Sequence, residues 1–520
     1  MRRGAKLSII VQAGGEGTRM QGLTKVKPKA LIPIKGKPVL FHLFDQFPEA
    51  EFSIIGDYKY EVLEAYLATF AGGVNYRLLR PCEKGNAAGI RHALEDVPEG
   101  RPVLLIWSDL MLAEEFRLPE PREGCQVGVV DFPCSRRLLP GGSLAKEPGG
   151  CGAADGVAGM YYFDTKAWLR DLPEGGSFFG WLQSHPEIPL HPLPLPRCTD
   201  LGTLSAYQKA ESTDHRCRPY NRVDVLEDKV IKTALTEEAA KLIEREVAWY
   251  RRMAAYGFSA MPRLLGTNPL TLERIQGGSV FLAQQGEEQR RRTLDAIITA
   301  VLEMHSLDSA PASAADLRTE YYDKTLHRLQ SIRRALPFAD QAEICINGTP
   351  CANLLCCPQR LLRAVESTLM GISTYCPIHG DCQLTNTLLG PDGRVYFIDA
   401  RGYFGSSQIL GDARYDWAKI YYAIAGNFDQ FNVKRFSLDF PAEGGARYSI
   451  ASGGWEHLVP HFTARIPAAE ANLCQIRLIH AIIWLSMASH AWEDYDSMCV
   501  AFLHGLTLFH EWELDYDAAQ

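Results

Sequence analysis

Short continuous apolar runs alternate with amphipathic segments along the first 210 residues of the chain. The apolar runs predict buried strands at 7–12, 52–55 and 103–107. The amphipathic segments predict helices at 38–47, 60–70 and 89–94. Strands that alternate with helices favour a mostly parallel sheet with helices on both faces, so an α/β domain is expected here.

The pattern changes after residue 219. It predicts, in chain order, a hairpin at 222–226 and 230–234, a long amphipathic helix at 236–256 and a strand at 270–275. The remainder is predicted as mostly helical, interrupted by a loop around His379 and a strand at 395–398. This second region is expected to fold as α+β, with a small sheet lobe followed by a helical lobe.

A polar stretch without periodicity, 211–219, separates the two patterns. It follows a proline-rich extended segment at 186–196 and a predicted helix at 204–210. A chain of 520 residues also exceeds what a single hydrophobic core usually serves. We therefore predict two domains, residues 1–213 and 214–520.

The composition is that of an ordinary globular protein, with 46% hydrophobic and 22% charged residues. A net charge of -8 argues against a general nucleic-acid partner. The 14 cysteines are irregularly spaced, which favours reduced thiols. The apolar run at 7–11 is too short for a signal peptide, and no stretch approaches the ~20 apolar residues of a membrane span. We predict a cytoplasmic protein without a membrane partner.

Glycines follow the first predicted strand directly. The motif runs from Val11 to Arg19 and supplies possible phosphate contacts, namely Ala13, Gly14, Gly15, Gly17 and Thr18. Glycines let backbone N–H groups approach a triphosphate without an intervening Cβ. Arg19 offers a forked donor set, and Lys29 offers a mobile positive charge. Because ligands of α/β sheets bind beyond the carboxyl ends of strands, Asp109 after the strand at 103–107 belongs to the same expected site.

These residues resemble the sugar-1-phosphate nucleotidyltransferases, a family that includes phosphocholine cytidylyltransferases, across residues 7 to 210. The resemblance implies a Rossmann-like fold in which Asp109 and Asp200 hold Mg²⁺ and Lys146 meets the acceptor phosphate. It also implies that the segment 83–89 cups the nucleotide base, through Glu83, Gly85, Asn86 and Ala88. A dinucleotide-binding fold is the weaker alternative, since the glycine spacing and the missing acidic residue disagree with it.

The implied reaction is nucleotidyl transfer. The acceptor phosphate attacks the α-phosphorus of a nucleoside triphosphate, and pyrophosphate leaves. Two anions must meet, so the barrier is largely electrostatic, and a magnesium ion would relieve it. The segment that cups the base offers mainly backbone contacts, so CTP, UTP and GTP all remain open as the triphosphate.

A second motif begins at His379. Asp381 and Asn386 lie five residues apart on one predicted loop, and Asp399 ends the strand at 395–398. In kinase-like sites the aspartate orients the substrate hydroxyl or takes its proton, while an asparagine coordinates magnesium. The motif resembles the aminoglycoside phosphotransferase and choline kinase superfamily across residues 219 to 520.

This second resemblance implies the remaining parts of an ATP and Mg²⁺ site. Lys232 would touch the phosphates and pair with Glu246 of the long helix. Asn221 would lie on the loop that covers the nucleotide, and Glu273 in the hinge beside adenine. Asn386 and Asp399 would hold the metal, and Asp381 would act on the hydroxyl. His379 is expected to fix the loop rather than to act as an acid.

The sequence leaves the acceptor of the kinase half open. Aromatic residues crowd the carboxyl-terminal half, at Tyr403, Phe404, Tyr415, Trp417, Tyr421, Tyr422, Trp484 and Trp492. They would suit a cage for a quaternary ammonium group, a stacking face for a sugar or, for most of them, plain core packing. Asp412 and Asp416 would either meet an amine or lie on the surface.

Together the motifs predict a bifunctional enzyme. The carboxyl-terminal half would use ATP to phosphorylate a hydroxyl of a sugar, polyol or amino-alcohol. The amino-terminal half would couple that phosphate to a nucleoside triphosphate, giving an activated metabolite for surface polysaccharide or cell-wall metabolism. One alternative is a choline or ethanolamine kinase joined to its cytidylyltransferase, and another is a nucleotide-sensing regulator with one inactive half. The oligomeric state is left open.

Overall fold

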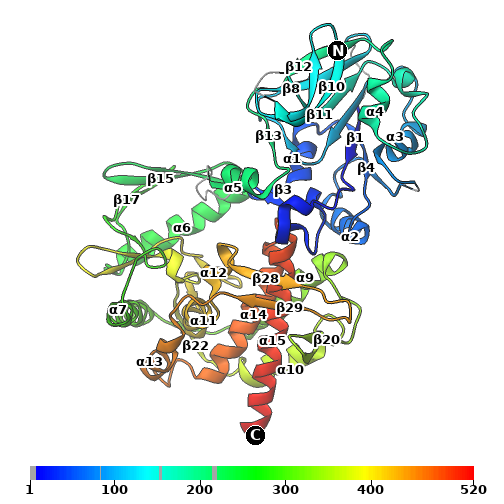
Figure 1. The fold of residues 1–520 in the computed structure, drawn as a ribbon. Helices are drawn as coiled ribbons and strands as arrows, with labels where there is room; N and C mark the ends of the chain where they lie inside the picture. Colours follow the sequence, from blue (N-terminus) through cyan, green and yellow to red (C-terminus); the bar gives the residue numbers. More distant parts are fainter. Residues whose placement is uncertain (1–6, 82, 152–154, 213–219, 520) are drawn as a thin grey trace. The chain divides into compact units, whose positions relative to one another are not determined.

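The computed structural model describes residues 7–81, 83–151, 155–212 and 220–519. The chain divides into two compact units (Figure 1). Unit 1 comprises residues 1–215 together with 493–495, and unit 2 comprises residues 216–492 and 496–520. Most of the predicted linker, residues 213–219, lies outside the described residues, and the domain boundary stays a prediction.

Unit 1 is built on a nine-stranded sheet. Its strands are β1 Ser8–Gln12, β4 Glu51–Ile55, β5 Tyr76–Leu79, β6 Val103–Trp107, β8 Cys125–Val130, β9 Cys134–Leu139, β10 Ser143–Cys151, β11 Gly156–Phe163 and β12 Leu190–Pro194. The strands β5, β4, β1 and β6 are parallel neighbours, whereas β11 runs antiparallel to β6, β8 and β9. The expected α/β fold is present, but the sheet is mixed rather than mostly parallel.

Short connections join the strands of the antiparallel half of the sheet. The connections between β8, β9, β10 and β11 span only three or four residues each. The turn between β9 and β10 joins antiparallel neighbours, since a parallel pairing would need a crossover of a dozen or more residues. Strands β8 and β9 do not pair with each other; both pair with β11.

Helices cover both faces of this sheet. They are α1 Val39–Gln46, α2 Tyr60–Phe70, α3 Asn86–Glu95 and α4 Phe178–Gln183, with α5 Leu204–Ser212 at the end of the unit. On one face the ring of Phe44 in α1 lies 4.9 Å from that of Phe52 in β4. On the other face Ile90 of α3 shares a buried cluster with Ile55 of β4. Figure 1 shows α1 and α3 on opposite sides of β1.

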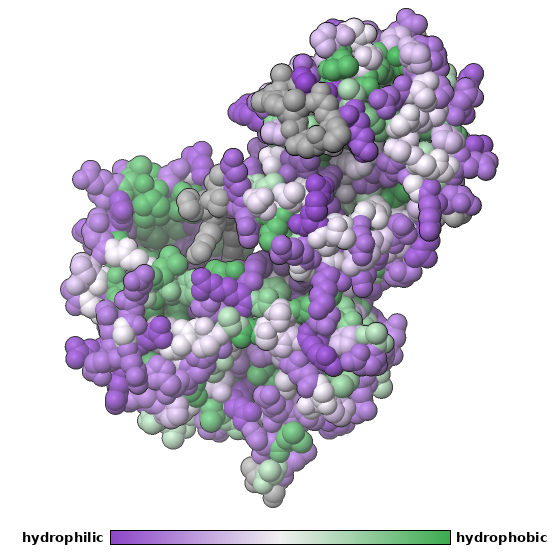
Figure 2. Space-filling view, viewed as in Figure 1, coloured by the Kyte–Doolittle hydropathy of each residue, from purple (hydrophilic) through white to green (hydrophobic). Residues whose placement is uncertain are grey.

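Unit 2 begins with a small antiparallel sheet and one long helix. The elements are β14 Asn221–Val225, β15 Lys229–Ala234, α6 Glu237–Ala255, β16 Leu264–Thr267 and β17 Leu270–Glu273, with strand order β14-β15-β17-β16. The hydroxyl of Thr236 caps α6 by accepting from the N–H of Ala239, as an N-cap threonine does. Figure 2 shows apolar side chains exposed around β15, where Val225, Leu226 and Leu235 reach solvent.

The rest of unit 2 is a larger, mainly helical lobe. Its helices are α7 Glu287–His305, α8 Ala314–Arg318, α9 Lys324–Ile332, α10 Pro358–Thr368, α11 Ala413–Ile424, α12 Phe428–Asn432, α13 Val459–Arg465, α14 Leu473–His490 and α15 Tyr495–Ala519. Short strands support the loops, namely β18 Gly278–Ser279, β19 Ala310–Pro311, β22 Thr374–Pro377, β23 Thr387–Leu389, β24 Val395–Phe397 and β27 Leu410–Gly411. Among the described residues, no helix is both long and apolar enough to cross a bilayer.

Beyond the hairpin β23–β24 and that of β25 Tyr403–Phe404 with β26 Ser407–Gln408, two hairpins with longer strands interrupt the region that was predicted as mostly helical. They are β20 Glu343–Ile346 with β21 Thr349–Ala352, and β28 Phe436–Asp439 with β29 Arg447–Ile450. The prediction was wrong at these two places. Elsewhere in the lobe the helical core agrees with it, since α14 is largely buried and packs against α9 and α11.

Candidate active sites

A cavity of about 940 Å³ opens at the carboxyl ends of the parallel strands in unit 1. The glycine loop after β1 forms part of its wall. The lining residues that were predicted from sequence are Gly14, Gly15, Gly17, Thr18, Arg19, Lys29, Glu83, Gly85, Asn86 and Asp109. Residues that were not predicted also line it, among them Gln12, Asp57, Lys84 and Trp107. The volume lies at the upper end of the range for small-molecule sites.

Backbone contacts fix the segment that was expected to cup the base. Gly85 has a φ of 103°, and a Cβ placed on it would lie 2.3 Å from the carbonyl oxygen of Gly176. The N–H of Gly176 donates to the carbonyl of Lys84 at 3.1 Å. The side-chain oxygen of Asn86, the first residue of α3, accepts from the N–H of Phe178 at 2.8 Å. Only glycine fits at position 85, because backbone packs against it there.

Two short strands bring Asp109 and Asp200 together. Strand β7 Leu110–Met111 pairs with β13 Thr199–Asp200, so that Asp200 lies opposite Leu110. The N–H of Leu201 donates to the carbonyl of Asp109 at 2.8 Å. The two aspartates are 91 positions apart in sequence, and the ladder makes them neighbours.

The electrostatics of this pair favour a cation. Partial desolvation, with the negative charge of Asp109 adding to it, raises the pKa of Asp200, although one side of that residue is exposed. The N–H of Gly202 donates to Asp200 at 2.6 Å, and the ammonium group of Lys29 forms an ion pair with Asp109. Two carboxylates with mutual repulsion and hard oxygen donors are what a magnesium site requires of the protein, since substrate phosphates complete the coordination.

The other residues predicted for this site are not among those that line the cavity. Ala13 is buried and donates its N–H to the carbonyl of Ile55 at 2.9 Å, and Ala88 is half-buried within α3. Lys146 is exposed in strand β10, opposite Arg136. It does not line the cavity, and its role toward the acceptor phosphate stays a prediction.

In unit 2, Lys232 of β15 connects two carboxylates. Its ammonium group lies 2.8 Å from Glu246 of α6 and 2.6 Å from Asp399. Glu246 is 4% exposed; burial and the charge of Asp399 raise its pKa to about 7 in spite of the lysine. The ion pair expected from sequence is present, and it holds the lysine beside the aspartate that was assigned to the metal.

The loop after β22 carries Asp381 with both of its oxygens engaged. The amide of Asn386 donates to Oδ2 of Asp381 at 2.8 Å, and the ammonium group of Lys419 lies 2.9 Å from Oδ1. The N–H of Ile398 donates to the carbonyl of Asn386 at 3.0 Å, which brings Asn386 next to Asp399. Asp381, Asn386 and Asp399 therefore form one constellation. Lys419, a buried residue of α11, was not predicted, since its neighbours in sequence are those of an ordinary core helix.

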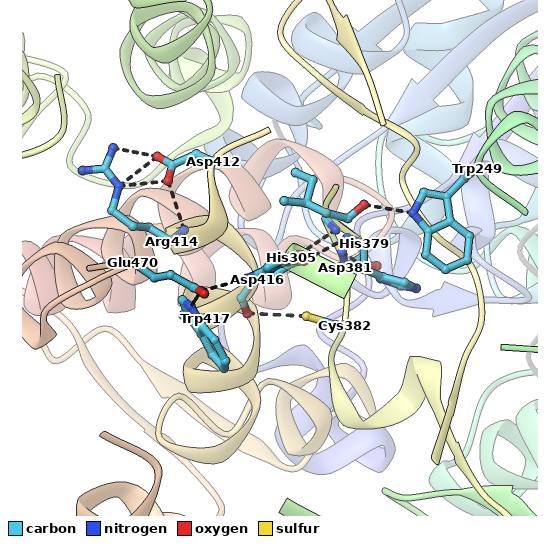
Figure 3. A network of polar contacts seen from close by, with 12 residues as sticks. Trp249, His305, His379, Asp381, Cys382, Asp412, Arg414, Asp416, Trp417 and Glu470 are labelled. Carbon is cyan, nitrogen blue, oxygen red and sulfur yellow. Dashed lines mark hydrogen bonds and ion pairs between the residues drawn. The ribbon is translucent and has the colours of Figure 1, made fainter. Parts of the chain in front are cut away.

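Asp416 holds the backbone of this loop (Figure 3). Its carboxylate accepts from the N–H of His379 at 2.9 Å and from the N–H of Gly380 at 2.7 Å. His305 lies between Asp416, at 3.3 Å, and Glu470, at 2.9 Å. Burial opposes a charge on His305, but the hydrogen bonds to the two carboxylates outweigh it and raise its pKa to about 9. A protonated histidine thus neutralises the buried aspartate that shapes the loop.

The ring of His379 stabilises the same loop. It is fully buried, its Nδ1 accepts from the N–H of Asp381 at 3.1 Å, and its Nε2 donates to the carbonyl of Ile398 at 3.1 Å. Burial lowers its pKa, which keeps the ring neutral for these two bonds.

Asp412 and Asp416 are neither surface residues nor ligands for an amine, and that expectation was wrong. Asp412 is 1% exposed and forms a two-pronged ion pair with Arg414, whose Nε and terminal nitrogen lie 2.9 and 2.7 Å away. Asp416 is fully buried against the loop backbone. The spacing of these two aspartates in the sequence does not indicate whether their carboxylates are exposed or buried.

Two further predicted residues lie at the edges of the small lobe. Asn221 is the first residue of strand β14, opposite Ala234, rather than a loop residue. Glu273 ends β17, and its carboxylate forms an ion pair with Arg263 at 2.8 Å. The structure gives neither a contact with the Lys232 group, so their parts in nucleotide binding stay predictions.

Comparison with known proteins agrees with this division. Residues 9–116 match the model of the MobA-like NTP transferase domain, and residues 220–435 match that of the phosphotransferase enzyme family. The chain joins a MobA-like NTP transferase domain to an APH-type phosphotransferase domain. Each family model falls on one of the two groups of residues described above.

Curated relatives of the chain are nucleotidyltransferases by name. The UTP–glucose-1-phosphate uridylyltransferase AglF of Haloferax volcanii is 31% identical over 96 residues, which are 18% of this chain and 38% of that protein. The N-acetylmuramate alpha-1-phosphate uridylyltransferase of Caulobacter vibrioides is 34% identical over 108 residues, 19% and 44% of the two chains. The 2-aminoethylphosphonate cytidylyltransferase of Lancefieldella rimae is 29% identical over 127 residues, 24% and 51%. The chain thus spans about half the length of these relatives or less.

Proposed function

We propose that the protein is a bifunctional enzyme that phosphorylates a small hydroxyl compound and then activates the product with a nucleotide. The phosphotransferase unit uses ATP, and the NTP transferase unit uses a second triphosphate. The product serves surface polysaccharide or cell-wall metabolism, and both steps take place in the cytoplasm. The observation that carries the proposal is that each unit assembles a separate constellation for phosphate chemistry from residues far apart in sequence.

In the phosphotransferase unit, Asp381 accepts the proton of the acceptor hydroxyl. The hydroxyl oxygen forms a bond to the γ-phosphorus of ATP, the bond from that phosphorus to the β–γ bridging oxygen breaks, and ADP leaves. Lys419 orients the carboxylate of Asp381 through their ion pair, and Lys232 binds the phosphates of ATP. The loop that carries Asp381 thus positions the acceptor hydroxyl, and Lys232 positions ATP. Buried residues hold both the loop and the lysine in place.

In the NTP transferase unit, the phosphate made in the first step is the nucleophile. One of its oxygens forms a bond to the α-phosphorus of CTP, UTP or GTP, and the bond to the departing pyrophosphate breaks. Arg19 and Lys29 neutralise the phosphates in the cavity, and the backbone of the glycine loop binds them without steric hindrance. The names of the relatives favour UTP or CTP.

Magnesium fits both sets of residues. Asp109 and Asp200 would hold it in unit 1, and Asn386 and Asp399 would hold it in unit 2. Within the described ranges no cluster of three or more His, Cys, Asp or Glu side chains could hold a metal by itself. One or two carboxylates suffice when the phosphates of the substrate supply the remaining oxygens. The ion would supply charge neutralisation between two anions.

Coupled product formation tests the proposal. The full-length protein is incubated with ATP, Mg²⁺, one triphosphate at a time and a panel of sugars, polyols and amino-alcohols, while ADP and pyrophosphate are measured. We expect pyrophosphate from an unphosphorylated acceptor only when ATP is present. Pyrophosphate that forms without ATP, or ADP that forms with no later pyrophosphate for any triphosphate, would contradict the two-step scheme and favour a single active half.

A further inference from the structure

Positive charge is concentrated beside Asp381. The ammonium group of Lys419 lies 2.9 Å from Asp381, and Arg401 contacts the catalytic loop through its backbone N–H, which donates to the carbonyl of His379 at 2.9 Å. Lys324 and Arg328 lie close enough to Arg401 for their charges to interact with its charge, and we term Lys324, Arg328, Arg401 and Lys419 the cationic cluster.

One buried carboxylate organises this cluster. Glu320 receives Arg401 at 2.7 Å on both of its oxygens and Lys324 at 2.6 Å. Burial alone would favour the neutral acid, but the charges of Arg401 and Lys324 lower the pKa of Glu320 to about 2. Glu320 lies in the π-helical turn Thr319–Asp323 between α8 and α9, a local distortion that often marks functional sites.

The charges of the cluster do not balance. Even without Lys324, its three remaining cations, Arg328, Arg401 and Lys419, face two carboxylates, Glu320 and Asp381. The side chains of Arg401 and Lys324 are only 12% and 20% exposed, so solvent screens the excess poorly. Burial, with the charges of Arg401 and Arg328 adding to it, lowers the pKa of Lys324 to about 7 although Glu320 opposes the shift. The free site therefore holds more positive charge than its own acids neutralise.

The aromatic faces around the cluster are already occupied by cations of the protein. The guanidinium of Arg401 lies 4.1 Å from the ring centre of Tyr403 and 5.3 Å from that of Tyr415. The ammonium of Lys419 lies 5.0 Å from the ring centre of Tyr422. A quaternary ammonium ligand would have to displace these contacts and approach an excess of like charge. The aromatic cage considered from the sequence is thus filled from within.

We propose that the acceptor of the phosphotransferase unit is an anion: a hydroxyl compound whose carboxylate or phosphate group is bound by Lys324, Arg328 and Arg401 while its hydroxyl faces Asp381. This inference rests on the proposed function of the unit. Forked arginine donors suit either anionic group, and the distance between that group and the reacting hydroxyl decides which compound fits. The same electrostatics disfavour choline and ethanolamine.

Charge-matched acceptors test the inference on the full-length protein. ADP formation is measured with ATP, Mg²⁺ and glucose, glucosamine, choline, glucuronate or glucose 6-phosphate. We expect turnover of at least one of the two anions with a kcat/KM at least tenfold above that of any neutral or cationic compound. The two anions separate a carboxylate from a phosphate requirement. A neutral or cationic compound that is used as well as the anions overturns the inference but leaves the kinase assignment intact.

Matched variants locate the anion site. Arg328→Gln removes one cation of the cluster, and Arg334→Gln removes an exposed arginine of the following turn as a control. We expect Arg328→Gln to lower kcat/KM for the anionic acceptor at least tenfold, mainly through KM, with KM for ATP unchanged. Lys324→Gln is the second variant in case Arg328→Gln melts below the control. Equal kinetics in control and cluster variants would overturn the inference.

A binding measurement decides the case in which none of the five compounds gives ADP. Calorimetry then follows glucuronate and glucose 6-phosphate binding to the full-length protein in the presence of a non-hydrolysable ATP analogue. Affinity at least tenfold weaker in Arg328→Gln than in Arg334→Gln supports the anion site and counts against the kinase activity. No binding, or equal binding by both variants, overturns the anion site.

Discussion

The two sites of this chain are built in opposite ways. In unit 1, the glycine loop and the segment 83–86 line a cavity of about 940 Å³ together with the side chains of Arg19, Lys29 and Asp109. In unit 2, a buried network holds one short loop: Asp416 binds the loop backbone, and His305 neutralises Asp416. The first site depends on positions without a Cβ, such as Gly85, whereas the second depends on buried charged side chains that lie in pairs.

This difference separates chemistry from stability in one unit and couples them in the other. Loss of Asp200 in unit 1 removes an exposed carboxylate whose ionised form is disfavoured in the folded protein. Loss of a network residue in unit 2 leaves a buried charge without its partner, which is strongly destabilising. The predictions below test the comparison, beginning with the largest expected effect.

Substitution of a single carboxylate should abolish the activity of one unit and leave that of the other intact. Asp109→Asn removes a charge that opposes two meeting anions, and we expect pyrophosphate release to fall about 10³-fold with ADP formation intact. Asp381→Asn keeps the shape of the loop but loses the proton acceptor, and ADP formation should fall by about 10² to 10⁴-fold. Each variant is the control for the other in paired ADP and pyrophosphate assays. Each unit is also assayed alone, with its own direct substrates. If one substitution abolishes both ADP and pyrophosphate formation in these assays, the two sites are not independent.

A single methyl group at position 85 should impair unit 1 alone. Gly85→Ala would place a Cβ 2.3 Å from the carbonyl of Gly176, so the segment that cups the base must move. Gly100 also has a positive φ, but a Cβ placed on it would meet no atom within 4 Å, so Gly100→Ala carries the conformational strain without the clash. We expect at least a tenfold loss of pyrophosphate release for Gly85→Ala relative to Gly100→Ala. Equal activities would show that the segment 83–89 can move away from Gly176 without loss of nucleotidyl transfer.

The network of unit 2 should make stability depend on pH. His305 binds its proton more tightly in the folded protein, with a pKa of about 9, than in the unfolded chain, where 6.5 is expected. Its contribution to stability is therefore complete below pH 6.5 and is lost as the pH rises toward 9, by roughly 3 kcal/mol at most. Denaturant unfolding of unit 2 at pH 6, 7.5 and 9 measures this loss. His305→Gln should flatten the profile, and His327→Gln, an exposed residue of α9, should not.

Asp200 should show the smallest effect on stability. Its raised pKa means that the ionised carboxylate is disfavoured in the folded protein, by desolvation and by Asp109. Asp200→Asn should therefore abolish pyrophosphate release while leaving the melting temperature of unit 1 unchanged or slightly raised. Differential scanning calorimetry without nucleotide checks this. A drop of several degrees would mean that Asp200 contributes to the stability of unit 1 as the buried network contributes to that of unit 2.

Local patterns in the sequence predicted the helices and strands whose formation depends mainly on their own residues. The helix Tyr60–Phe70 and the strand Val103–Trp107 were predicted to the residue, since their periodicity and flanking breakers are local. The antiparallel half of the sheet in unit 1 was not predicted, because strand direction depends on partners far along the chain. The hairpin β20–β21 had a local signal that was overlooked, the Asn347-Gly348 pair between two short β-type runs.

The candidate sites divide in the same manner. The glycine loop, the two separated aspartates and the loop at Asp381 were found because each has a characteristic short motif. Lys419 and Asp416 have no such mark: they lie three residues apart on a helix whose sequence is typical of a core. Their importance follows only from the fold, which turns both of them toward the same loop. Tertiary contacts of this kind cannot be inferred from spacing alone.

The indole of Trp249 has a consequence for regulation. It lies on α6, three residues after Glu246, and its N–H donates to the carbonyl of Ile378 at 2.9 Å, directly before the catalytic loop. The helix that carries the partner of Lys232 is thereby fastened to the segment that carries Asp381. An on–off switch that swings this helix outward would have to break a fully buried bond and expose a tryptophan. Throughput in this unit is therefore expected to follow the supply of its substrates rather than a conformational gate.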